Sequence, residues 1–191
     1  MQEIFGQIVD FFINNLKELG PLFGVFIIIL ESVFPILPLA VFLSFNAIAF
    51  GPILGFIINW FATCLGCLLS FYSFKKGFGQ RWDRDMKNDS KVRDTLTYIK
   101  KVSFPALVVL MALPFTPAFA INISSGLSNM SPKKFIPAVL ISKPSIIFFW
   151  SYVGKTVITS SGDIWKLIQM CLIVLLTYLV SLILKNKIKE N

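Results

Sequence analysis

Histidine is absent from this chain of 191 residues, and charged residues make up only 15% of it. Without histidine, a metal site lacks its commonest ligand, and a response to pH near neutrality lacks its usual side chain. The three cysteines are Cys64, Cys67 and Cys171, and no second closely spaced pair accompanies Cys64 and Cys67. We therefore expect no metal centre and no disulfide framework. The chain is 55% hydrophobic, which excludes both a typical soluble domain and a disordered one.

The sequence also lacks the groups that hydrolytic enzymes need. It has no paired carboxylates, and its serines have no histidine base. We expect no catalytic residue, no cofactor and no enzymatic activity. The first fifteen residues contain no Lys or Arg, so we expect no signal peptide. The net charge of +8 is carried beside apolar segments, which favours a membrane protein over a nucleic-acid partner.

Between Glu18 and Lys75 the only charged residue is Glu31, followed by Pro35 and Pro38. A charge at the centre of a bilayer costs about 2.5–3.5 kcal/mol, so this carboxylate needs a functional reason. The prolines disfavour a continuous helix, and broken backbone in a membrane must be covered by protein or line a wet cavity. This stretch predicts a re-entrant hairpin that lines a cavity. The alternative is a tilted, kinked span through Phe34 followed by a half-helix.

The sequence predicts an all-α polytopic membrane protein with one integral membrane domain over residues 1–191. Its segments are an amphipathic helix (1–19), a first hairpin (20–51), a span (52–74), a cytoplasmic basic loop (75–101), a second hairpin (102–131) and spans at 135–157 and 164–184. We expect the 135–157 span to be interrupted at Lys143-Pro144. In the 52–74 span, small residues share one face that allows close helix approach: Gly55, Ala62, Gly66 and Ser70.

Basic residues predict the orientation of the chain in the membrane. The 75–101 loop has nine Lys or Arg against four Asp, which places it in the cytoplasm together with Lys133, Lys134 and the C-terminus. The uncharged segment 102–131 must then enter from the cytoplasm and return to it. This argues independently for a second hairpin.

The two hairpins share a proline motif. Pro35-x-x-Pro38 and Pro114-x-x-Pro117 are 79 residues apart, and each leads into a span. Because the two following spans run in opposite directions, the motifs predict inverted repeats whose broken helices meet near the midplane. The alternative is coincidence among ten prolines.

Several motifs together resemble the DedA family, also called the SNARE-associated or VTT-domain family. They are Glu31-x-x-x-Pro35-x-x-Pro38, Phe50-Gly51, Gly55, Gly77-x-Gly79, Pro114-x-x-Pro117, Asn122, Gly126-Leu127-Ser128 and Phe135. The resemblance implies two facing hairpins and movement of lipids across the bilayer. Bacterial members are linked to recycling of undecaprenyl phosphate and to the proton-motive force, and eukaryotic relatives are lipid scramblases. Members commonly carry an Arg three residues before the first proline of the second motif, and some carry another three residues after it. Here those positions are Met111 and Pro117.

The candidate site follows from these patterns. Glu31 is the candidate for binding and releasing a proton, and Lys143 can replace the missing Arg as a partner for a phosphate or for Glu31. Possible headgroup-binding residues are Thr116, Asn122, Ser124, Ser125 and Gly126, which could instead satisfy broken backbone. We expect a protein of the cytoplasmic membrane that translocates undecaprenyl phosphate or phospholipid, with lipids and protons as partners. The alternatives are a proton-coupled transporter of a small solute and a membrane-homeostasis component that transports nothing. The oligomeric state stays open.

Overall fold

The computed structural model describes residues 21–33, 39–78, 90–159 and 164–190, and all the regular structure in these ranges is helical. The predicted amphipathic helix at 1–19 and the prolines Pro35 and Pro38 lie outside the described residues. The elements are α2 (Pro21–Val33), α3 (Leu39–Ala49), α4 (Gly51–Ser73), the π-helix η1 (Phe74–Phe78), α6 (Ser90–Lys101), α7 (Phe104–Ala112), α8 (Ala118–Leu127), α9 (Pro132–Thr159) and α10 (Ile164–Glu190).

Three of the described helical stretches are long and apolar enough to cross a membrane, and they match the three predicted spans. They are Gly51–Lys76, Pro132–Val157 and Trp165–Leu184. At about 1.5 Å per residue, α2, α3, α7 and α8 are each too short to cross the hydrocarbon of a bilayer, which is about 30 Å thick. The described part of the chain therefore combines three full-length apolar helices with two pairs of half-length ones.

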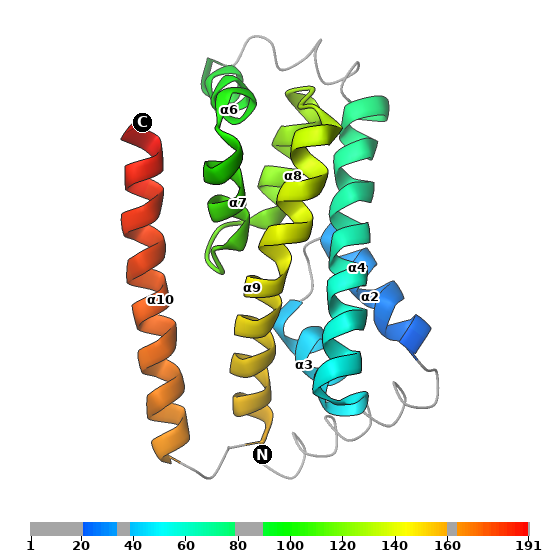
Figure 1. Cartoon of the computed structure of the whole chain (residues 1–191), viewed down its shortest axis with the longest axis vertical. Helices are drawn as coiled ribbons and strands as arrows, with labels where there is room; N and C mark the ends of the chain where they lie inside the picture. Colours follow the sequence, from blue (N-terminus) through cyan, green and yellow to red (C-terminus); the bar gives the residue numbers. More distant parts are fainter. Residues whose placement is uncertain (1–20, 34–38, 79–89, 160–163, 191) are drawn as a thin grey trace.

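The two long helices α4 and α9 form the centre, and the short helices pack around them (Figure 1). Helix α3 packs against both α4 and α9, while α2 and α8 pack against α4 and α7 packs against α9. Helices α7 and α8 run in opposite directions from a turn in the middle of the molecule (Figure 1). Helix α10 packs against α9 and leaves most of its apolar side chains exposed, as expected for a helix that faces lipid.

The predicted small-residue face of α4 is buried at all four positions. A β-carbon added at Gly55 would lie 2.6 Å from the carbonyl oxygen of Asn46, so α3 and α4 touch there through backbone. Beside this contact the Asn46 amide donates to Asn59 Oδ1 at 2.8 Å, and the Asn59 amide donates to the Leu43 carbonyl at 2.9 Å. Buried amides in an apolar bundle require such partners, so this pair fixes α3 on α4.

The predicted interruption at Lys143-Pro144 is wrong, because α9 continues through Pro144 as one helix. Proline has no N–H and leaves the carbonyl four residues earlier, that of Leu140, without its helical donor. The indole Nε1–H of Trp60 on α4 donates to this carbonyl at 3.3 Å. A neighbouring helix thus supplies the missing donor, which is the usual way that membrane helices tolerate an internal proline.

Basic residues gather at one end of the molecule. The C-terminal end of α4, helix α6, the start of α9 and the end of α10 all lie there (Figure 1). Two lysines connect elements at this end: Lys75 Nζ donates to the Met130 carbonyl at 2.6 Å, and Lys134 Nζ donates to the Val102 carbonyl. The segment 102–131 leaves this end of the molecule and returns to it (Figure 1).

Candidate functional site

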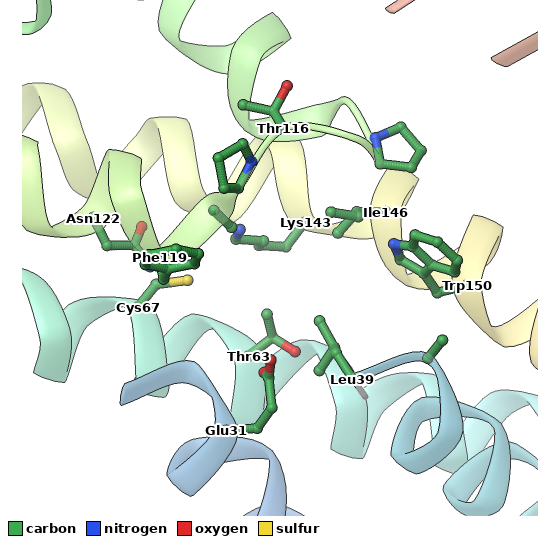
Figure 2. A pocket seen from close by; sticks show the side chains of 14 residues that line it. Glu31, Leu39, Thr63, Cys67, Thr116, Phe119, Asn122, Lys143, Ile146 and Trp150 are labelled. Atoms are coloured by element: carbon green, nitrogen blue, oxygen red, sulfur yellow. The ribbon is translucent and has the colours of Figure 1, made fainter. Parts of the chain in front are cut away.

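A cavity of about 400 Å³ lies where the short helices meet α4 and α9. Its walls come from the ends of α2 and α3, from α4, from the turn between α7 and α8, from α8 and from α9 (Figure 2). The lining residues are Glu31, Leu39, Ala40, Thr63, Cys67, Pro114, Thr116, Pro117, Ala118, Phe119, Asn122, Lys143, Ile146 and Trp150.

Two opposite charges face this cavity. Lys143 on α9 is 1% exposed and Glu31 on α2 is 9% exposed, so both are withdrawn from the surface. Figure 2 shows the two side chains on opposite sides of the cavity. Within the described residues, neither has a hydrogen bond or an ion pair. Buried charges are normally paired, so this arrangement leaves both charges available to something that enters the cavity.

Three polar side chains of the lining are also without a partner. Thr63 Oγ1, Thr116 Oγ1 and Asn122 Oδ1 are buried and make no hydrogen bond among the described residues. Thr63 is 3% exposed and Asn122 is 1% exposed. An unpaired buried hydroxyl or amide costs about 1–3 kcal/mol. Three residues that line one cavity thus leave hydrogen-bonding capacity unused.

The second proline motif shapes the wall that carries Thr116. Leu113 precedes Pro114 and has extended backbone angles, as a residue before proline prefers, so α7 ends there. The Thr116 N–H donates to the Leu113 carbonyl at 3.2 Å and closes the turn. Pro117 then caps the start of α8. The turn thus holds Thr116 at the cavity between two helices that point away from it.

Aromatic side chains form one edge of the cavity. Phe115, between two lining residues, contacts the lining residue Trp150 with ring centroids 6.0 Å apart. Phe115 also meets Tyr178 of α10 edge-to-face, with ring centroids 5.4 Å apart. Such contacts are each worth about 0.5–1.5 kcal/mol. The Phe115 ring therefore links the second turn to both α9 and α10.

Comparison with known proteins places this arrangement in a family. The model of the VTT domain matches residues 20–156, which include every residue that lines the cavity. The chain belongs to the VTT domain family. This is the DedA family that the sequence motifs resemble.

Two relatives from Bacillus subtilis (strain 168) are similar to this VTT domain protein. The uncharacterized membrane protein YhjE is 32% identical over 142 residues, which cover 74% of this chain and 68% of YhjE. The uncharacterized protein YqeD is 27% identical over 127 residues, which cover 66% of this chain and 61% of YqeD. No solved structure matches the chain.

The VTT domain brings together many of the residues singled out from the sequence. Glu31, Lys143 and four residues of the second motif and its helix line one cavity: Pro114, Thr116, Pro117 and Asn122. Ser124, Ser125 and Gly126 lie further along α8 and are not among the described lining residues. At Gly126 an added β-carbon would lie 2.6 Å from the Phe71 carbonyl, so Gly126 lets α8 approach α4.

Sequence reasoning missed part of the VTT domain cavity. Thr63, Phe119 and Trp150 were not singled out, and Cys67 was considered only as a possible metal or disulfide cysteine. A threonine inside a long apolar span is the one signal that points to Thr63. The lining role of Cys67 and the two aromatic residues depends on which face of each helix turns inward, and the sequence pattern does not give this for helices that are apolar all round.

Proposed function

We propose that this VTT domain protein moves a lipid with an anionic phosphate headgroup across the cytoplasmic membrane. The observation that carries the proposal is the cavity, which is lined by a buried lysine, a buried glutamate and three residues with unpaired polar atoms amid apolar helices. A phosphate in hydrocarbon loses all of its hydration, and this cavity offers replacements for it.

The chemistry of the lining suits a phosphate. Lys143 supplies the positive charge, and a buried ammonium without a partner attracts an anion strongly because the surroundings have a low dielectric constant. The hydroxyl of Thr63 is free among the described residues to donate a hydrogen bond to a phosphate oxygen. Glu31, on the opposite wall, repels the phosphate when it is ionised and tolerates it when it is protonated. Proton uptake and release at Glu31 would then couple to headgroup binding.

We further propose how the protein sits in the membrane. Helices α2 and α3 form one re-entrant hairpin, and α7 and α8 form the other, so that the two hairpins enter from opposite sides as inverted repeats. The end that gathers Lys75, Lys134 and the C-terminal lysines faces the cytoplasm. The cavity between the hairpins then lies near the middle of the bilayer, where a headgroup in transit needs polar contacts most.

A second candidate function is proton-coupled transport of a small solute. A cavity of about 400 Å³ holds a small molecule, and the opposed Glu31 and Lys143 can bind a zwitterion as readily as a phosphate. The aromatic edge connects the cavity through Tyr178 to α10, whose apolar side chains are largely exposed. This connection favours a lipid over a small solute as the substrate. In either case we propose a transporter and not an enzyme.

Reconstitution into liposomes tests the proposal. The protein is placed in vesicles that contain labelled undecaprenyl phosphate or a labelled phospholipid, and the fraction of each label reached by an outside quencher is followed with time. We expect movement of the prenyl phosphate in the wild type and at least a tenfold slower rate in Lys143→Met. The matched control is Lys133→Met, which removes a lysine from the same helix but from the basic end, and it should behave as the wild type does.

The outcomes separate the candidates. Movement of both lipids indicates a scramblase, and movement of the prenyl phosphate alone indicates a dedicated carrier. If folded wild-type protein moves neither lipid, the lipid proposal is wrong. A pH gradient that collapses only when a small solute is added would instead support the second candidate.

A further inference from the structure

The cavity lysine stands directly before the helix defect in α9. Lys143 is followed by Pro144, which leaves the Leu140 carbonyl without a helical donor, and Trp60 Nε1 donates to that carbonyl at 3.3 Å. One bond from α4 therefore repairs the turn of α9 that presents the cation to the cavity.

The indole is held firmly for this role. Trp60 packs against both large apolar clusters of the molecule, one formed around Phe71 and Phe135 and the other around Ile28 and Ile147. Its helix also carries Thr63, one turn further on, which lines the cavity. The same segment of α4 thus forms one wall of the site and fixes the part of α9 that forms another.

We propose that Trp60 is a positioning residue, which sets the place of the Lys143 ammonium in the cavity through its hydrogen bond to the Leu140 carbonyl. The inference rests on the proposed function in one respect, that Lys143 binds the headgroup. Without the indole donor, the carbonyl has no partner in an apolar environment, and helices bend at an unsupported proline. A bend of about 20° moves the end of a long side chain by about 2 Å. Misplacement on that scale is enough to weaken a binding contact strongly.

The first test removes the indole N–H of Trp60 and then supplies a backbone N–H in its place. Trp60→Phe keeps an aromatic ring but loses the N–H, and we expect about a tenfold rise in the prenyl phosphate concentration that gives half of the maximal rate. Pro144→Ala restores a backbone N–H that donates to Leu140. The double variant Trp60→Phe/Pro144→Ala should therefore return to within about twofold of Pro144→Ala alone. Trp165→Phe, an exposed tryptophan on α10, is the matched control and should change nothing.

A second comparison separates positioning from general support of the fold. The Lys143→Met variant has no ammonium at this position. Adding Trp60→Phe to it should therefore leave unchanged the prenyl phosphate concentration that gives half of the maximal rate. A role confined to folding predicts the same loss with or without Lys143. That result would overturn the proposal, as would a Trp60→Phe defect that Pro144→Ala fails to rescue.

A third measurement does not depend on lipid transport. In a chain in which Cys64, Cys67 and Cys171 are replaced by alanine, Lys143→Cys places one thiol at the site, and its rate of reaction with a small methanethiosulfonate reagent reports its position. We expect Trp60→Phe to change this rate at least fivefold and Pro144→Ala to reverse the change. If the wild type moves no lipid, the proposed function fails while this labelling still tests Trp60. Equal labelling rates with and without Trp60→Phe would refute the positioning role itself.

Discussion

Neutralising both charges of the cavity should make the protein more stable while it abolishes transport. Glu31→Gln and Lys143→Met keep the volumes of the side chains close to the originals and remove the charges. The two residues face one cavity without forming an ion pair among the described residues, so each charge bears most of its own desolvation. Removing both charges therefore relieves both desolvation costs.

The size of the effect follows from the burial of the two groups. Lys143 is 1% exposed and Glu31 is 9% exposed, and replacing a buried charge pair by neutral groups of similar volume is often stabilising by about 1–4 kcal/mol. The glutamine side chain introduced at position 31 is still polar, so we expect the lower part of the range, a gain of about 1–3 kcal/mol.

The assay is reversible unfolding in mixed micelles, followed by tryptophan fluorescence, with transport measured on the same preparations. The double variant should unfold at a higher denaturant concentration than the wild type and should move no lipid. Lys133→Met is the control, because a lysine at the basic end should change stability by less than about 0.5 kcal/mol. The two single variants should be less stable than the double variant, since each leaves one buried charge alone.

A double variant that loses 1 kcal/mol or more would refute this reasoning. It would mean that the two charges hold the bundle together, and the cavity would then be a structural feature of the fold. A double variant that is more stable and still transports lipid would confirm the desolvation cost of the two charges. It would also show that neither charge is needed to bind the substrate.

Three further changes test the packing that builds the cavity. Gly55→Leu should prevent folding or cost at least about 3 kcal/mol, because its β-carbon would meet the Asn46 carbonyl at 2.6 Å in backbone that has no room to move; the yield of folded protein after purification checks this. Asn59→Leu should cost about 2–3 kcal/mol in the unfolding assay, because it leaves the Asn46 amide and the Leu43 carbonyl without partners, and a loss below 0.5 kcal/mol would contradict it. Phe135→Ala should cost about 3–5 kcal/mol, because this ring is fully buried and stacked on a ring of α4, and unchanged stability would argue against that packing.

Much of the fold follows from the sequence because membranes impose simple rules. Long uncharged runs must be helical, so the three spans are readable from hydropathy, and basic residues indicate which segments share an end of the molecule. The turn at Pro114 and Pro117 is readable as well, since prolines end helices. The continuity of α9 at Pro144 is not readable, because it depends on Trp60, a residue 84 positions earlier in the chain.

The site is only partly readable for a related reason. Glu31 and Lys143 are conspicuous because a charge in an apolar stretch is costly, so composition alone selects them. Thr63 carries no such cost, and threonines are common in membrane helices that do not bind anything. Its importance appears only when the fold leaves its hydroxyl buried and without a hydrogen bond beside the two charges. A charged residue in an apolar stretch can thus be found from the sequence, whereas a buried hydroxyl without a hydrogen-bond partner can be found only from the structure.

The position of the cation bears on how such a cavity works. The resemblance to the DedA family leads one to expect an arginine on the second hairpin, at the position of Met111, but Met111 is buried in the apolar cluster of α4, α7 and α9. Here the positive charge comes instead from α9, a helix of 28 residues that Trp60 ties to α4. A headgroup bound to Lys143 is therefore held by a long helix, while the half-length helices α2 and α8 supply Glu31 and Asn122 and the turn before α8 supplies Thr116.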